Sequence, residues 1–153
     1  MILVATKHEY EPAKERFKDE EIVITGVGGL NVVKTLMNYP KDTPIINFGY
    51  VGSNKLPIGT EVKVGRCELY HPNVTYDEPR YTLDGDVPCY TSNDFVLKTR
   101  IEEPCIFDME LAHIMALGFT NVQSIKIVSD NLSLKEYERK VEENGRRKTK
   151  RCR

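Results

Sequence analysis

Short apolar runs alternate with stretches of helical spacing along this chain, and this alternation limits the possible fold more than any other feature. Residues 1–5, 22–24 and 45–48 are such runs, and 105–107 and 122–128 repeat the pattern later in the chain. Runs of this length suit strands that are buried on both faces, and helices between them imply parallel β-α-β units. We therefore expect an α/β fold, a three-layer α/β/α sandwich with a mostly parallel mixed sheet.

The segments between the strands supply the expected helices and one long loop. Residues 11–18 have a polar helical pattern that opens at Pro12, and apolar residues at helical spacing follow a glycine turn at 25–29. Further helices are predicted at 109–117 and 134–144, and Gly145 is placed where a helix C-terminus is expected. The polar, proline-rich residues 71–88 are predicted to form a long loop, with or without a hairpin in it.

Length and charge favour one folded domain with a basic tail. The chain has 153 residues, of which 40% are hydrophobic and 29% charged, as in ordinary globular domains. The last ten residues contain six Lys or Arg and no acid, so the other 143 carry 16 basic and 23 acidic side chains, a charge of -7. We assign residues 1–144 to the domain and 145–153 to a basic tail. Such a tail suits either a solvated extension or a polyanion-binding segment.

Several classes of protein are excluded by the same simple features. No apolar stretch is long enough to span a membrane, and the first residues do not resemble a signal peptide, so we expect a cytoplasmic protein. The four cysteines have no zinc-ligand spacing and are predicted to be reduced thiols. We expect no metal and no cofactor. The glycine turn at 25–29 is not part of a dinucleotide-binding motif, because Asn31 stands where that motif has its third glycine.

Three acidic residues stand where predicted strands end. Glu9 follows the first strand, Glu110 follows the strand at 105–107, and Asp130 follows the strand at 122–128. Each alone suits a helix cap or a charge in a first helical turn, and Ser129 with Asp130 would cap the last helix well. Together they would meet at one edge of the sheet, where open α/β sheets bind their ligands. The alternatives of capping and catalysis stay open at this point.

The order of these motifs resembles the nucleoside phosphorylase and nucleosidase superfamily, most nearly the 5'-methylthioadenosine/S-adenosylhomocysteine nucleosidases. The resemblance rests on ordered pieces that span residues 1 to about 135. They are the first strand with Glu9, the glycine turn at 25–29, the strand end Ile-Ile-Asn-Phe-Gly-Tyr-Val-Gly-Ser at 45–53, Leu-Pro-Ile-Gly-Thr-Glu-Val at 56–62, Phe-Asp-Met-Glu-Leu-Ala at 107–112, and Ile-Lys-Ile-Val-Ser-Asp at 125–130. The resemblance implies a phosphorylase/hydrolase-like fold.

The resemblance also implies roles for particular residues in cleavage of an N-glycosidic bond. Asp130 would protonate the purine at N7 with help from Ser129, and Glu9 would orient the attacking water. Met109 and Glu110 would bind the ribose, and Phe95 would stack on the purine. The remaining substrate-binding residues are Gly52 and Tyr50 at the floor of the site, and Lys126, which stands where the nucleosidases have arginine.

The attacking nucleophile is suggested by one position in the resemblance. Phosphorylases of the superfamily carry an arginine where this chain has Asn47. The resemblance therefore implies water as the nucleophile and hydrolysis of an adenine (thio)nucleoside such as methylthioadenosine or S-adenosylhomocysteine. The alternatives are a purine nucleoside phosphorylase and a catalytically silent nucleoside-binding protein. The resemblance further implies a homodimer, with an interface expected beside Tyr50 and residues 71–88. We expect neither a membrane nor a nucleic-acid partner.

Overall fold

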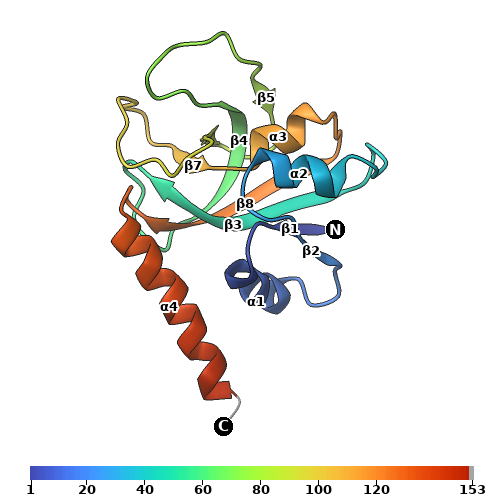
Figure 1. Ribbon diagram of the computed structural model, residues 1–153, viewed down its shortest axis with the longest axis vertical. Helices are drawn as coiled ribbons and strands as arrows, with labels where there is room; N and C mark the ends of the chain where they lie inside the picture. The colour runs from blue at the N-terminus through green and yellow to red at the C-terminus, as the bar shows by residue number, and fades with distance from the viewer. Residues whose placement is uncertain (152–153) are drawn as a thin grey trace.

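A computed structural model describes the backbone of residues 1–151 and the side chains of residues 1–146 (Figure 1). Strands and helices alternate along most of this part of the chain, as the sequence predicts. In chain order they are β1 (Ile2–Val4), α1 (Lys7–Arg16), β2 (Ile22–Ile24), α2 (Gly29–Leu36), β3 (Ile45–Ser53), β4 (Glu61–Leu69), β5 (Tyr81–Thr82), β6 (Val87–Thr91), β7 (Ile106–Asp108), α3 (Leu111–Ala116), β8 (Val122–Asp130) and α4 (Leu134–Arg151).

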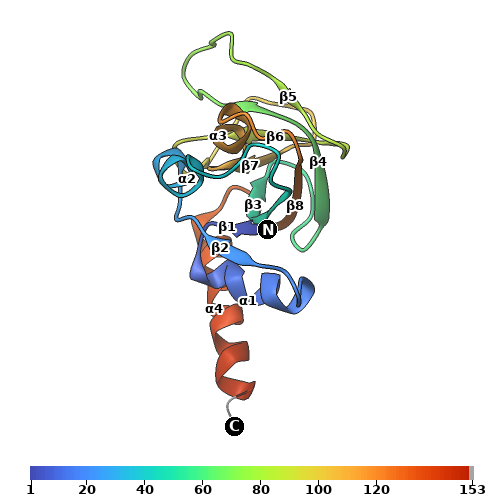
Figure 2. The same ribbon diagram turned by 90° about the vertical axis from the view of Figure 1, so that its right-hand side faces the viewer.

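The eight strands belong to one mixed sheet, part of which closes on itself (Figure 2). Strands β1, β2, β3 and β8 are parallel to one another, whereas β4 is antiparallel to β8 and β7 is antiparallel to β3. Because β4 also pairs with β6, and β6 with β7, strands β3, β8, β4, β6 and β7 form a closed ring. The α/β class and the mixed sheet are confirmed. The three-layer sandwich is not confirmed in that form, because five strands close into a ring.

The first strands carry helices on both faces, which their side chains explain. Side chains alternate between the two faces of a strand. On β1, Leu3 packs with residues of α2 and α3, whereas Ile2 and Val4 pack with Ala13 of α1. All three β1 side chains are at most 1% exposed, which accounts for the uninterrupted apolar run. A further core fills the ring and includes Val64, Cys67, Cys89, Ile106 and Val128.

Helix α1 begins earlier than the sequence pattern predicts. The helix starts at Lys7, so Pro12 lies inside it and does not open it. A capping box formed by Thr6 and Glu9 begins the helix, because Glu9 Oε2 accepts the backbone N–H of Thr6 at 2.9 Å. Glu9 therefore lies in the first turn of α1.

Two of the predicted boundaries are wrong in the second half of the chain. The predicted loop at 71–88 carries β5, which pairs with β4, and it ends before residue 88, because β6 begins at Val87. Pro88 stands within β6, opposite Arg66, and prolines of this kind hide a strand from pattern analysis. Helix α4 does not end at Gly145 but continues to Arg151. The residues predicted as a basic tail are therefore helical as far as the structure describes them.

Cysteines 67, 89 and 105 are free and buried, while Cys152 lies outside the described residues. Burial raises the pKa of the Cys67 and Cys105 thiols to about 12, so neither is a reactive thiolate near neutral pH. In the part of the chain that the structure describes, no helix combines the length and the apolar character needed to cross a membrane.

Candidate active site

A cavity of about 260 Å3 opens at the carboxyl ends of β1, β3 and β8. It brings together every predicted site residue except Lys126, although those residues come from segments that are far apart in the chain. The cavity is lined by Ala5, Thr6, Glu9, Val27, Tyr50, Val51, Gly52, Asp94, Phe95, Val96, Phe107, Asp108, Met109, Glu110, Ser129, Asp130 and Tyr137.

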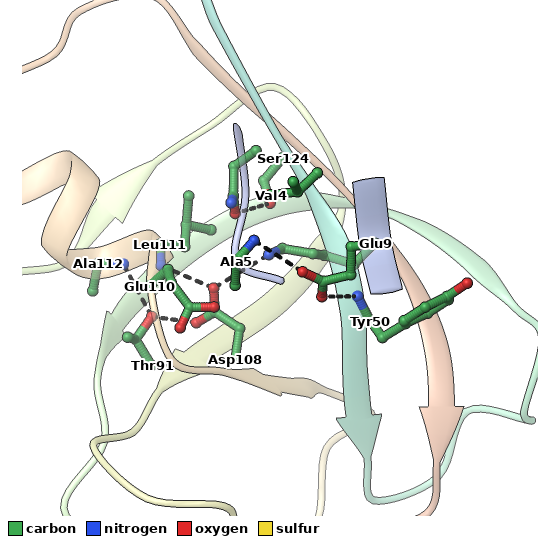
Figure 3. A network of polar contacts seen from close by, with 12 residues as sticks. Val4, Ala5, Glu9, Tyr50, Thr91, Asp108, Glu110, Leu111, Ala112 and Ser124 are labelled. Carbon is green, nitrogen blue, oxygen red and sulfur yellow. Dashed lines mark hydrogen bonds and ion pairs between the residues drawn. The ribbon is translucent and has the colours of Figure 1, made fainter. Parts of the chain in front are cut away.

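The Glu9 carboxylate is held by backbone groups of two neighbouring strands (Figure 3). Its Oε2 accepts the N–H groups of Ala5 and Thr6 at 2.9 Å, and its Oε1 accepts the N–H of Tyr50 at 2.9 Å. A carboxylate offers about four acceptor sites, so Oε1 keeps one for a ligand in the cavity. Glu9 is thus both a helix-capping residue and a cavity residue, and the two interpretations of this position are compatible.

Glycine at position 49 makes room for the Glu9 carboxylate. A Cβ placed there would lie 2.6 Å from Glu9 Oε1, closer than such atoms approach in proteins. Gly52 has a similar relation to Asp130, since its Cβ would lie 3.0 Å from Asp130 Oδ1. The two glycines of the 45–53 segment therefore allow two carboxyl groups to approach the backbone of β3.

We expect Gly49→Ala to lower turnover at least about 10-fold and the free energy of unfolding by roughly 1–3 kcal/mol, because the Glu9 carboxylate must move. Steady-state kinetics and thermal unfolding would measure the two effects. Gly145→Ala is the matched control: a Cβ there meets nothing within 4 Å, and the helix should gain about 0.5–1 kcal/mol without loss of turnover. Full activity of Gly49→Ala would show that the position of Glu9 does not matter.

Glu110 enters the cavity from the turn between β7 and α3. Its Oε2 accepts the N–H of Gly28 at 3.0 Å. The glycine turn at 25–29 therefore donates a hydrogen bond to a side chain of the cavity. Burial, with the nearby Asp108 carboxylate, raises the pKa of Glu110 to about 8. The raised pKa favours the protonated form of Glu110 near neutral pH, and a positive charge beside the group would favour the ionised form.

Lys126 does not line the cavity, which corrects the prediction that it contacts substrate. Its side chain is 2% exposed, and its Nζ lies 3.5 Å from Asp108 Oδ2. Burial would lower the pKa of Lys126, but the Asp108 and Glu110 carboxyls outweigh burial and raise it. The family that the sequence resembles has an arginine at this position. Lysine has a shorter side chain without the planar guanidinium group, so the charge of Lys126 stays behind the cavity wall.

Asp108 lines the cavity and is held by hydrogen bonds to Thr91 and Leu111, which Figure 3 shows. Its Oδ1 accepts the Thr91 hydroxyl at 2.6 Å and its Oδ2 accepts the Leu111 N–H at 2.8 Å. Thr91 Oγ1 in turn accepts the N–H of Ala112 at 3.0 Å. These bonds tie β6 and β7 to the start of α3, so that Asp108 holds the turn on which Met109 and Glu110 stand.

Asp130 ends β8 and is fully buried. Its Oδ1 accepts the N–H groups of Leu132 and Ser133 at 2.9 and 3.2 Å, and its Oδ2 lies 2.8 Å from Ser129 Oγ. Burial is the largest influence on Asp130 and raises its pKa above the usual value, although these hydrogen bonds lower it. Ser133, whose Oγ accepts the Glu136 N–H, stands directly before α4. Ser129 and Asp130 therefore belong to the strand end and do not cap the helix themselves.

Aromatic side chains close the cavity beside α4. Phe95, from the loop after β6, contacts Tyr137 of α4 edge to face, with ring centroids 5.7 Å apart. The hydroxyl of Tyr50 accepts a hydrogen bond from Asn144 Nδ2 at 2.6 Å, and Lys140 Nζ lies 5.9 Å from the Tyr50 ring centroid. The last helix thus forms part of the site.

Sequence analysis missed several residues that line the cavity. Tyr137 lies in a charged helical segment, and no sequence motif distinguishes it. Only a helical projection of the segment after Asp130 could have indicated that Tyr137 lies near the site. Asp108 and Asp94 stood within or beside quoted motifs without an assigned role, and Val27 was counted only as part of a turn. In the described residues, no group of three or more His, Cys, Asp or Glu side chains has the arrangement of a metal site.

Comparison with known proteins supports the fold. No family model matches the chain, and no curated protein matches it. Among solved structures, a mutant of the Helicobacter pylori 5'-methylthioadenosine/S-adenosyl homocysteine nucleosidase (MTAN) with 5'-methylthioadenosine in the active site is 14% identical. Its TM-score is 0.76 over 94% of this chain and 91% of that chain. The Streptococcus pneumoniae MTA/SAH nucleosidase in complex with 8-aminoadenine is 16% identical, with a TM-score of 0.72 over 97% and 94%.

A different hydrolase is similar to a comparable degree. The Helicobacter pylori futalosine hydrolase mutant is 12% identical, with a TM-score of 0.72 over 94% of this chain and 91% of that chain. The class that these structures define is the nucleosidase fold. This chain has that fold, in agreement with the resemblance seen in its motifs.

Proposed function

We propose that the protein hydrolyses the N-glycosidic bond of an adenine nucleoside, with a thionucleoside such as methylthioadenosine as the leading substrate. The observation that carries this proposal is the convergence of Glu9, Glu110 and Asp130 on one small cavity, each held by backbone N–H groups. The ligands named for the similar structures, 5'-methylthioadenosine and 8-aminoadenine, support an adenine-based substrate.

The chemistry of the bond assigns these carboxyl groups different roles. Cleavage develops positive charge on the ribose and negative charge on the departing purine. Asp130, whose pKa is raised by burial, gives its proton to N7 of the purine as the C1'–N9 bond breaks. Water held at Glu9 attacks C1' and gives its proton to that carboxylate. The products are adenine and the free ribose derivative.

The remaining cavity residues bind the two halves of the nucleoside in this proposal. Met109 packs under the ribose, and Glu110 accepts its hydroxyl groups and stabilises the positive charge. Phe95, with Tyr137 behind it, stacks on the purine. Gly52 and Tyr50 form the floor, Ser129 orients Asp130, and Lys126 acts from behind Asp108 without touching substrate.

Water is favoured over phosphate as the nucleophile by the character of the cavity. No Lys, Arg or His side chain of the described residues lines it, so a phosphate dianion would find no partner. Asn47 is buried, and its Oδ1 accepts the Ser124 hydroxyl at 3.2 Å, so it does not take the place of an arginine. The phosphorylase alternative therefore has less support.

We expect adenine release from methylthioadenosine at the same rate with and without phosphate, and no ribose 1-phosphate product. Chromatography of the reaction mixture would separate the products. Formation of a sugar phosphate would show that the reaction is phosphorolysis and not hydrolysis. Binding of the nucleoside without any cleavage would instead favour the silent nucleoside-binding protein.

The proposal includes purine salvage in the cytoplasm and a homodimer. An interface beside Tyr50 has little support, because Asn144 and Lys140 of α4 already cover that side chain. Leu30, Val33 and Met37, exposed by 76%, 38% and 57%, form a stripe on α2 that is a better candidate for the interface. Sedimentation should give a dimer that Leu30→Glu dissociates, and a wild-type monomer at micromolar concentration would contradict the dimer.

A further inference from the structure

Helices α2 and α3 lie side by side (Figures 1 and 2), and one side chain between them has an unusual environment. His113 stands on α3, three residues after Glu110. Its Nε2 is buried, and it has no hydrogen-bond partner within the part of the chain that the structure describes. An unpaired buried polar atom costs stability, so hydrogen bonding of this nitrogen does not explain why an imidazole stands here.

The packing of the His113 ring is closer than its hydrogen bonding. The ring contacts Gly29, the first residue of α2, where an added Cβ would lie 2.7 Å from both Cε1 and Nδ1 and 2.8 Å from Cδ2. Three nearly equal distances to atoms around a five-membered ring place this Cβ position over the face of the ring. Only a residue without a Cβ allows so close an approach. The face of the imidazole is therefore in direct contact with the backbone of the glycine turn.

This contact completes a circuit of neighbours that includes the Glu110 carboxyl. Glu110 Oε2 accepts the N–H of Gly28 at 3.0 Å, and Gly28 directly precedes the residue that packs on the ring. The N–H of His113 donates to the Glu110 carbonyl at 3.1 Å, so the ring and the carboxyl belong to the same helical turn. The glycine turn is thus held by a hydrogen bond to Glu110 and by a flat ring beside it.

The protonation of His113 suits this contact. Burial lowers the pKa of His113, and the opposing effect of the Asp108 carboxylate is smaller, so the neutral ring is favoured near neutral pH. The N-terminus of a helix carries partial positive charge. A neutral ring packs against the start of α2 without the repulsion that an imidazolium would meet there.

We propose that His113 is a positioning residue for Glu110, because the face of its ring holds the glycine turn where the Gly28 N–H meets the Glu110 carboxyl. The inference rests on the proposed function only in taking Glu110 as a group that binds the ribose. His113 does not line the cavity. It acts on the site through the backbone of residues 28 and 29.

The titration of Glu110 reports on this contact and can be followed without substrate. Burial has the largest effect on the pKa of Glu110 and raises it, whereas the Gly28 N–H lowers it. His113→Ala leaves a gap beside Gly29 and weakens that hydrogen bond, so the titration midpoint of Glu110 should rise and turnover should fall about 10-fold. ¹³C NMR of protein labelled at its glutamate carboxyl carbons would measure the midpoint, with Glu110→Gln to assign the signal.

His113→Phe separates the shape of the ring from its nitrogen atoms. The phenyl ring is also flat and has no nitrogen to leave unpaired. The Glu110 midpoint should therefore stay at the wild-type value, turnover should stay within about 3-fold of the wild type, and thermal stability should rise.

Gly29→Ala tests the same contact from the other side. The added Cβ forces the ring and the turn apart, so turnover should fall about 10-fold and the Glu110 midpoint should rise. The double variant Gly29→Ala/His113→Ala has room for the Cβ and should lose no more turnover than either single variant. Independent sites would instead multiply to a loss of about 100-fold. If His113→Ala does not fold, Gly29→Ala and His113→Phe still decide the question.

Met115→Ala is the matched control for general loosening of α3. Met115 lies on the same helix but packs against the core inside the strand ring. Its truncation should lower thermal stability while the Glu110 midpoint stays unchanged. A midpoint that moves equally in Met115→Ala and His113→Ala would assign the effect to the helix as a whole and overturn the role of the ring.

The remaining outcomes separate this inference from the proposed function. A Glu110 midpoint that is the same in the wild type, His113→Ala and Gly29→Ala overturns the positioning role, and so does a His113→Phe midpoint shifted as far as that of His113→Ala. The expected midpoints, together with no release of adenine from methylthioadenosine by the wild type, would retain the positioning role and reject hydrolysis.

Discussion

Asp130→Asn should lower turnover at least about 10²-fold while the protein stays folded, because the amide cannot supply the proton that the leaving purine needs. The Asn Oδ1 can still accept the N–H groups of Leu132 and Ser133, which now hold the aspartate. The Ser129 hydroxyl can turn to the Val51 carbonyl, 3.2 Å away, and leave Oγ to accept from the new amide.

The stability of two variants separates catalysis from turn formation at this position. Asp130→Ala removes the oxygen that accepts both N–H groups and should lower the free energy of unfolding by about 1–3 kcal/mol beyond any effect of Asp130→Asn. Turnover and chemical denaturation would be measured for both variants. An Asp130→Asn protein with full activity would remove the leaving-group role, and one that unfolds would reduce Asp130 to a residue that stabilises the turn.

Glu110→Gln should have opposite effects on activity and on stability. Turnover should fall about 10²-fold or more, because the amide cannot ionise when positive charge develops on the ribose, whereas the Glu110 carboxyl can. The Gly28 N–H keeps an acceptor in the glutamine oxygen, so the fold loses no hydrogen bond. The variant should be more stable than the wild type at alkaline pH, because it no longer has to bury an ionised carboxylate.

The pH dependence of this stability difference has a definite sign. The pKa of Glu110 is about 8 in the folded protein and about 4.5 in an exposed glutamate, so the folded state binds the additional proton between these values. The wild type should therefore lose stability relative to Glu110→Gln as pH rises from about 4.5 to 8, by a total on the order of 5 kcal/mol. Parallel thermal unfolding curves at pH 5 and 8.5 would measure it. A difference that does not change with pH would show that Glu110 is not protonated in the cavity.

The strand and helix pattern could be predicted where one residue type dominates a segment. Short, mostly apolar runs identified β1, β3 and β8, because strands buried on both faces have few polar positions, although β8 also contains Gln123, Ser124 and Lys126. Strand β6 could not be found, since Pro88 and the polar residues before it are typical of a loop. The closed ring depends on pairings between strands distant in sequence, such as β4 with β6, which no local pattern records.

The residues of the candidate site were likewise predictable only in part. Acids at strand ends were predictable because parallel strands align their carboxyl ends, and Glu9, Glu110 and Asp130 indeed line one cavity. The placement of Lys126 was not predictable, because the length of one side chain decides whether its charge reaches the cavity or stops at Asp108. Tyr137 was missed because its contribution depends on how α4 crosses the end of the sheet.

Closure of the strand ring has a consequence for self-association. Unpaired strand edges act as templates for intermolecular β-pairing and aggregation. Strands β3, β8, β4, β6 and β7 pair with one another through backbone hydrogen bonds. The outermost strands of the described sheet are therefore β2 and β5. These strands have three and two residues, too few to template a long intermolecular sheet. The topology that surrounds the cavity therefore also protects this small domain against amyloid-like assembly.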